Sequence, residues 1–224
     1  MAKPITLYSF APGPNPWIVA IILEEYDTPY ETIFMSREDI HQESYELKNP
    51  NRKVPTIEDP NTGITLFESG AIIQYLIDTY DKTNKLVHTT LPQKYLTLSW
   101  LSLQMSAQGP YFWQAAYFAC FHPEKSVAAA IDRYVTEMKR IVGVIDRHLK
   151  RAGTQYLVGD KCTFADLAFV MWDQIMPLLV GEWDFKTEAP DFAAWNKGLV
   201  ARAVRKVLAD KERATSADHA APAS

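Results

Sequence analysis

Strand-like segments are confined to the first third of this chain, and this asymmetry constrains the fold more than any other feature. Short apolar runs such as residues 5–10 (ITLYSF), and the pair 54–59 and 64–68 around the turn signal PNTG, alternate with helix-like stretches. Beyond residue 93 the apolar residues recur at three- and four-residue spacings instead, which is typical of amphipathic helices. The sequence therefore predicts a small α/β domain followed by a larger all-helical domain.

The changes of pattern also predict the domain boundaries. Residues 1–82 carry the order β-α-β-α-β-β-α, residues 83–92 form a linker, and residues 93–210 are helical with an interruption at Gly109-Pro110. Residues 211–224 offer little apolar surface to bury, so we expect a disordered tail. The element order of the first domain, with Val54-Pro55 ahead of its third strand, resembles a thioredoxin-like fold.

Composition excludes several classes of function. The chain is 47% hydrophobic, which supplies a core, and its formal net charge of -4 argues against nucleic acid as the main partner. No apolar run reaches the roughly 18 residues of a membrane-spanning helix and no leader is evident, so we expect a soluble cytoplasmic protein. Cys120, Cys162 and the five histidines show no metal-site spacing, so we expect reduced thiols and no metal.

One polar residue stands between prolines ahead of an apolar helix, in residues 12–18 (PGPNPWI). Asn15 is a good N-cap residue, and Pro16 would suit the first helical position. Read locally, Asn15 is only a helix cap.

Three motifs, taken in order, resemble those of cytosolic glutathione transferases: KVP (53–55), ESGAIIQYL (68–76) and, after the change to an all-helical domain, GDKCTFADL (159–167). The resemblance extends to about residue 210. Thr163 and Asp166 in the last motif are predicted to form a helix-capping pair. The segment PNPW…ILEE, which leads into the first predicted helix, is most similar to the fungal class typified by a nitrogen-catabolite regulator. In that class an asparagine replaces the activating Tyr, Ser or Cys.

The resemblance implies a glutathione site in the first domain. Asn15 would be the catalytic residue, because its NH2 group can stabilise a thiolate although it can never act as a base. Val54 would pair its backbone with the cysteinyl part of glutathione, ahead of a cis Pro55. Glu68 would bind the γ-glutamyl ammonium, and Ser69 with the helix amides would bind its carboxylate.

Other parts of the site are less narrowly assigned. The glycyl carboxylate needs a cation, and His41, Arg52 and Lys53 are the candidates. Tyr8 and Ser9 are hydroxyl alternatives to Asn15, although their place in a strand favours packing. The resemblance also implies a hydrophobic substrate site, for which the candidates are Phe10, Pro12, Tyr111, Trp113 and Tyr117.

The predicted function is conjugation of glutathione, as co-substrate, to a hydrophobic electrophile, by a homodimer without metal. The same thiolate would serve a glutathione-dependent cis–trans isomerase acting on a conjugated alkene in secondary metabolism, or a peroxidase. A non-catalytic regulatory protein of the same fold is the alternative from another class. A thiol-disulfide reductase is disfavoured, because it would need a cysteine at position 15.

Overall fold

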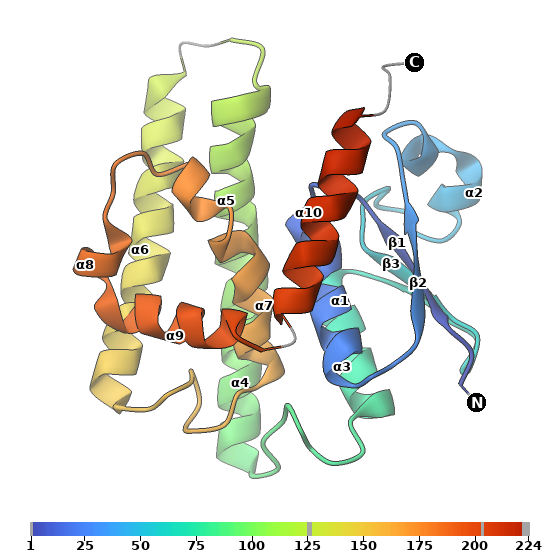
Figure 1. Cartoon of the computed structure of the whole chain (residues 1–224), viewed down its shortest axis with the longest axis horizontal. Helices are drawn as coiled ribbons and strands as arrows, with labels where there is room; N and C mark the ends of the chain where they lie inside the picture. The colour runs from blue at the N-terminus through green and yellow to red at the C-terminus, as the bar shows by residue number, and fades with distance from the viewer. Residues whose placement is uncertain (1, 125–126, 203, 221–224) are drawn as a thin grey trace. The chain divides into compact units, whose positions relative to one another are not determined.

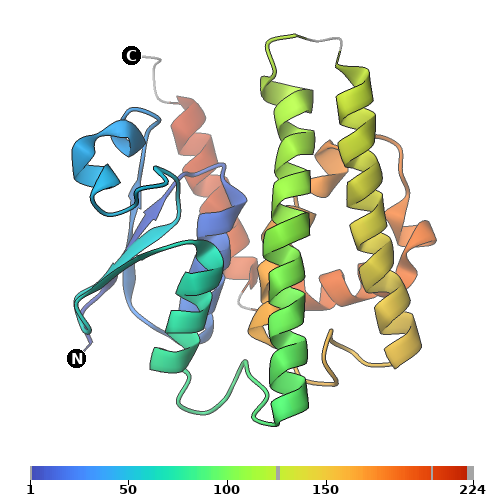
Figure 2. The same ribbon diagram turned by 180° about the vertical axis from the view of Figure 1, so that it is seen from behind.

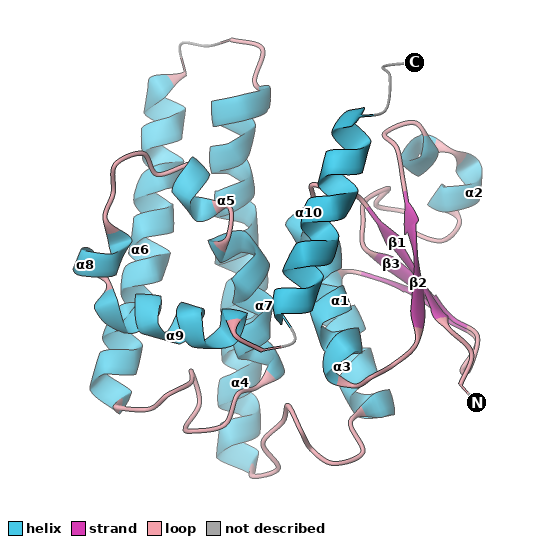
Figure 3. Ribbon diagram, viewed as in Figure 1, coloured by secondary structure: helices cyan, strands magenta, loops and turns pink. Residues whose placement is uncertain are grey.

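The structure, a computed structural model, describes residues 2–124, 127–202 and 204–220, with side chains as far as Ser216. The chain divides into two units (Figure 1). The first holds the residues up to Thr83 together with those from Ala201 onwards, and the second is Asn84–Val200. Every strand in the described part of the chain belongs to the first unit (Figure 3), as the sequence pattern predicts.

A four-stranded sheet organises the first unit, in the order β2-β1-β3-β4. Strand β1 is parallel to β2 and antiparallel to β3, and β3 is antiparallel to β4. This is the thioredoxin-like arrangement that the element order predicts. The elements of this unit are β1 (Ile5–Ser9), α1 (Pro14–Glu25), β2 (Tyr30–Phe34), a 3-10 turn (Asp39–His41), α2 (Glu43–Glu46), β3 (Thr56–Asp59), β4 (Ile64–Phe67), α3 (Ser69–Tyr80) and α10 (Val204–Ala220).

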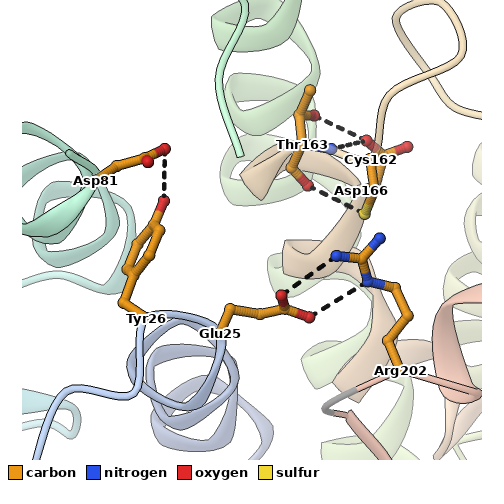
Figure 4. Close-up of polar contacts among 7 residues, drawn as sticks. All are labelled: Glu25, Tyr26, Asp81, Cys162, Thr163, Asp166 and Arg202. Carbon is orange, nitrogen blue, oxygen red and sulfur yellow. Dashed lines mark hydrogen bonds and ion pairs between the residues drawn. The ribbon is translucent and has the colours of Figure 1, made fainter. Parts of the chain in front are cut away.

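Helices α1 and α3 pack against each other and against the sheet, and α2 lies on the opposite face (Figure 1). Helix α1 is buried on nearly every side, because its apolar residues leave no polar face. Its one buried charge, Glu25, is 4% exposed and pairs with Arg202, while Tyr26 next to it donates to Asp81 (Figure 4).

The regular structure of the second unit, in its described residues, consists of helices joined by loops, and α4 continues through α5 to run beside α6 (Figure 2). The interruption expected at Gly109-Pro110 takes the form of a π-helical segment, because Pro110 has no N–H to continue the α-helical pattern. The elements are α4 (Leu91–Leu103), two π segments (Gln104–Gln108 and Tyr117–Phe121), α5 (Gly109–Ala116), α6 (Ala128–Ala152), α7 (Phe164–Asp173), a 3-10 turn (Met176–Leu178), α8 (Phe185–Glu188) and α9 (Pro190–Val200).

The start of α7 confirms the predicted capping pair. Thr163 donates its backbone N–H and its hydroxyl to Asp166, at 2.8 and 2.7 Å (Figure 4). The other oxygen of Asp166 accepts from the backbone of Leu157 at 2.9 Å and from the indole of Trp195 at 3.0 Å. Four donors therefore converge on one fully buried carboxyl group.

The end of the chain differs from the expectation of a disordered tail from residue 211. Helix α10 continues to Ala220, and α10 belongs to the first unit. The physical reason is a short apolar stripe: Val204 and Val207 are both fully buried, and α10 packs on α1. The last four residues of the expected tail lie outside the described residues.

No described helix combines the length and the apolar character needed to cross a bilayer. Cys120 is exposed and Cys162 is buried, and neither forms a disulfide. The thiol of Cys162 donates to the carbonyl of Thr163.

Candidate functional site

Three segments that carry candidate residues leave the sheet at the same end of its strands. Tyr8, near the end of β1, is paired with Thr56 at the start of β3, and Thr56 is paired with Phe67 at the end of β4. The loop after β1, the residues before β3 and the turn into α3 therefore start from one row across three adjacent strands. Backbone pairing alone brings these three segments together.

The first of these segments ends at the N-terminus of α1. The helix begins at Pro14 with Gly13 as its N-cap, so Asn15 is its second residue and Pro16 its third. The local interpretation of Asn15 as the cap is thus wrong, because the cap is Gly13, two residues earlier. Gly13 is extended and donates its N–H to Phe10 at 2.9 Å, and this turn starts the helix earlier.

This helix start concentrates hydrogen-bond donors at one residue. The first N–H groups of a helix point out of its end, where the helix dipole favours an anion. Pro14 and Pro16 carry no N–H. Among the first three helical residues, Asn15 alone therefore has a backbone N–H, and its side chain, which is half-buried, adds an NH2 group.

The second segment, residues 49–55, is held by two residues that sequence reasoning missed. Asn49, 2% exposed, donates its side-chain amide to the carbonyl of Lys53 at 2.6 Å and to the hydroxyl of Thr56 at 3.0 Å. Tyr45 also donates to the Lys53 carbonyl, at 2.7 Å. The Val54-Pro55 peptide is cis, as predicted. The NPNRKVP run predicts a strand that starts at Val54-Pro55, but nothing in it points to a side chain that fixes a carbonyl.

The third segment is the turn into α3. Glu68 is the N-cap residue and Ser69 the first helical residue, so Ser69 is not the cap. Glu68 has φ 69°, in the region that favours glycine, a conformation that costs a non-glycine residue about 1–3 kcal/mol and that clusters at functional sites. The amide of Asn51 donates to the Glu68 carboxylate at 3.3 Å, which links this turn to the segment before β3.

The three candidate cations differ in their surroundings. Arg52 is engaged in an ion pair with Glu46. Lys53 is exposed beside Val54, and His41 is exposed at the end of the 3-10 turn. Because Tyr45, four residues after His41, holds the Lys53 carbonyl, the His41 segment is tied to the segment that carries Lys53.

The two hydroxyl residues considered as alternatives to Asn15 are engaged elsewhere in the fold: Tyr8 is hydrogen-bonded and Ser9 is buried. Tyr8 donates to Glu58 at 2.5 Å, and Lys48 lies 2.5 Å from the other oxygen of that carboxylate. Burial, and then the hydrogen bond to Glu58, raise the pKa of Tyr8. Burial opposes ionisation of Glu58, but hydrogen bonds from Lys48 and Tyr8 hold the pKa of Glu58 below its ordinary value. Ser9 is 1% exposed.

The candidates for the hydrophobic substrate fall in both units. Phe10, 37% exposed, and Pro12, half-buried, belong to the loop after β1. Tyr111, Trp113 and Tyr117 belong to α5 and the π segment that follows it, where the rings of Trp113 and Tyr117 lie 6.4 Å apart. Trp113 is 43% exposed, and the two tyrosines are half-buried.

A search of the described residues finds no cluster of three or more His, Cys, Asp or Glu side chains able to hold a metal ion. The groups brought together at this end of the strands include amides, the Ser69 hydroxyl, the Lys53 cation and the Glu68 carboxylate. This mixture suits an organic ligand that carries both anionic groups and an ammonium group.

Comparison with known proteins places this geometry in a family. The models "Glutathione S-transferase, N-terminal domain" and "Glutathione S-transferase, C-terminal domain" match residues 3–78 and 110–203. The glutathione S-transferase-like protein OpS6 of Beauveria bassiana is 47% identical over 210 residues, covering 93% of this chain and 96% of that protein. Protein URE2 of Candida maltosa is 33% identical over 237 residues, covering 90% and 71%.

Among solved structures, the glutathione transferase URE2P6 of Phanerochaete chrysosporium, in complex with oxidized glutathione, is 40% identical with a TM-score of 0.89. The match covers 95% of this chain and 98% of that one. With both family models, their order along the chain and the fold in agreement, the chain belongs to the glutathione S-transferase family and resembles its fungal, nitrogen-regulator-like members.

Proposed function

We propose that this protein is a glutathione transferase that ionises the thiol of bound glutathione and directs it at a hydrophobic electrophile. The observation that carries the proposal is the row Tyr8–Thr56–Phe67, from which the three segments that carry the candidate residues leave the sheet at the same end of its strands. Membership of the family supports the choice of glutathione as the ligand.

The thiol end of glutathione would lie at the N-terminus of α1. An ordinary thiol has a pKa of about 8.5, so lowering it by two units requires about 2.7 kcal/mol in favour of the thiolate. A hydrogen bond to a charged group supplies about 1.5–3 kcal/mol, and a helix terminus adds about 0.3–1 kcal/mol. The donors of Asn15, in the first turn of α1, would together be sufficient. Asn15 would stabilise the thiolate without taking its proton.

The rest of the peptide would be bound largely by backbone. Val54 would pair its N–H and C=O with the cysteinyl residue like an added strand, and the fixed Lys53 carbonyl supports this role by immobilising the preceding peptide. Glu68 would bind the γ-glutamyl ammonium, and Ser69 with the first amides of α3 would bind its carboxylate. For the glycyl carboxylate we favour Lys53 and His41 over Arg52, which already has an acidic partner.

Several finer assignments stay predictions from the resemblance. They are the contact of Phe10, Pro12, Tyr111, Trp113 and Tyr117 with the electrophile, the homodimer and the cytoplasmic location. Conjugation, cis–trans isomerisation and peroxidase activity would use the same thiolate. A regulatory protein without catalysis would differ by failing to ionise bound glutathione.

The test is a titration of bound glutathione by ultraviolet thiolate absorbance across pH, for the wild type and for three variants at one position. Asn15→Ala removes the side-chain donor, Asn15→Ser keeps one donor, and Asn15→Asp keeps the shape but adds a negative charge. We expect the thiol pKa to rise in the order wild type, Ser, Ala, Asp, with about one to two units between wild type and Ala.

Two results would overturn the proposal. A wild-type protein that does not bind glutathione would end the enzyme interpretation, and a thiol pKa that is the same in all four proteins would remove Asn15 from the mechanism. With an active substrate in hand, loss of free thiol in step with the substrate distinguishes conjugation from isomerisation, which consumes no glutathione.

A further inference from the structure

Helix α10 runs along α1 within the first unit (Figure 1). Val204 and Val207 of α10 are completely buried, and Leu208 is half-buried. Lys211 and Thr215, both half-buried, continue the same stripe at four-residue spacing. The stripe of buried and half-buried residues on α10 therefore extends to the last described side chains of the helix.

Ion pairs hold the beginning of α10, and Arg202 before it, to the end of α1. The guanidinium of Arg202 contacts both oxygens of Glu25, at 3.3 and 3.2 Å (Figure 4). Lys206 lies 2.7 Å from each oxygen of Glu24. Since Glu25 is only 4% exposed, its pair with Arg202 is shielded from salt far more than a surface pair would be.

The other end of α10 reaches the loop in front of α1. The hydroxyl of Thr215 donates to the carbonyl of Ala11 at 3.4 Å, and the indole of Trp17 donates to the same carbonyl at 2.8 Å. Ala11 stands four residues before Asn15 in the turn that leads into the helix. One carbonyl of this loop is thus held from α1 and from α10 at once.

The lengths of the two helices agree with these contacts. Lys206 pairs with Glu24 at one end. Nine residues further along α10 is Thr215, and nine residues back along the antiparallel α1 is Asn15, so both helices advance by about 14 Å. Thr215 therefore comes level with the first turn of α1.

We propose that α10 is a positioning element of the thiolate site: it is fixed to the end of α1 through Glu25 and Arg202 and braces, through Thr215, the loop that presents Asn15. The proposal rests on the function proposed above. Thr215 is a positioning residue that acts through the Ala11 carbonyl. Its loss lets the start of α1 move, so that the donors of Asn15 point less accurately at the sulfur.

The test compares three variants of the full chain by glutathione-thiol titration and by steady-state kinetics with a model aryl halide. Thr215→Val removes the hydroxyl at nearly constant volume, Thr215→Ser restores it, and Ser216→Ala removes an exposed hydroxyl from the neighbouring residue as a control. We expect Thr215→Val to raise the thiol pKa by about half a unit and to lower kcat about threefold with little change in KM. Thr215→Ser and Ser216→Ala should match the wild type.

The outcomes separate this proposal from the one on which it rests. If the wild type ionises glutathione and Thr215→Val has the same thiol pKa and kcat, α10 does not position the site and the inference is wrong. If the wild type ionises no glutathione, the proposed function itself has failed. Should Thr215→Val be too unstable to assay, Arg202→Met tests the fixed end of the helix, and an unchanged thiol pKa there refutes the inference equally.

Discussion

Replacing Asn49 by alanine should weaken both the fold and the binding of glutathione. Its side chain makes three hydrogen bonds: it donates to the Lys53 carbonyl and the Thr56 hydroxyl, and it accepts from the backbone N–H of Asn51 at 2.9 Å. Truncation removes all three. The Lys53 carbonyl and the Thr56 hydroxyl each keep a bond to Tyr45, so neither is left buried without a partner.

This arrangement sets the magnitude of the expected loss. At about 1 kcal/mol for each net hydrogen bond, and without an added desolvation penalty, Asn49→Ala should cost about 2–3 kcal/mol of stability. For a chain of this size that corresponds to a fall in Tm of about 4–12 °C. Allowing one or two residues of the loop to move before Val54 can pair with glutathione costs about 1–2 kcal/mol, or roughly a tenfold loss of affinity.

Thermal unfolding and calorimetric titration with glutathione measure the two effects. Asn61→Ala is a control with the same substitution at an exposed position, since the Asn61 amide donates to Lys3 and Asp59 at 2.9 Å each and to Tyr80 at 3.5 Å. Asn61 lies in the β3–β4 turn, at the opposite end of these strands. The Asn61→Ala protein should be less stable than the wild type and should bind glutathione with unchanged affinity. If Asn49→Ala and Asn61→Ala weaken glutathione binding equally, or if neither does, residues 49–55 do not present Val54 as argued.

Two further predictions concern buried carboxyl groups of the second unit. Asp166→Ala should cost about 4 kcal/mol or more in a denaturant titration, because four buried donors lose their acceptor; a loss below about 1 kcal/mol would contradict the assigned contacts. Burial raises the pKa of Asp173 well above its ordinary value, against hydrogen bonds from Asn196 and Gln108. As pH rises above about 4, Asp173 loses its proton in the unfolded chain at a lower pH than in the folded chain. The contribution of Asp173 to the stability of the fold therefore decreases as pH rises. The stability of Asp173→Asn should therefore depend less on pH between 4 and 7, and curves of equal slope would refute the argument.

The sequence predicts the fold well wherever a local pattern has one physical meaning. The TFAD capping signature and the PNTG turn between two short apolar runs are each sufficient by themselves. The cis peptide at Val54-Pro55 is predicted by the family resemblance and not by the local pattern alone. The start of α1 is harder, because Gly13, Asn15 and two prolines all suit a helix terminus. The choice between them is made by the turn bond from Gly13 to Phe10, which local preference does not contain.

Two features of the structure could not be predicted from local sequence. Residues 211–220 look too polar to fold by themselves, and they continue a helix whose Val204 and Val207 are buried and which packs on α1, nearly two hundred residues earlier. Only the completed fold brings these two helices together. Asn49 and Lys53 are four residues apart, but their hydrogen bond depends on a loop conformation that residue preferences alone do not specify.

The helix cap of α1 has a consequence for how the chemistry of such a protein can change. The helix starts from Gly13 and two prolines, without a side-chain cap bond, so the cap itself does not use the side chain at position 15. If Asn15 has the role proposed above, a serine or a cysteine at this position would be presented by the same helix start and would offer a hydroxyl or a thiol in place of an amide. The chemistry of the site would then change through one side chain while the cap of the helix stays as it is.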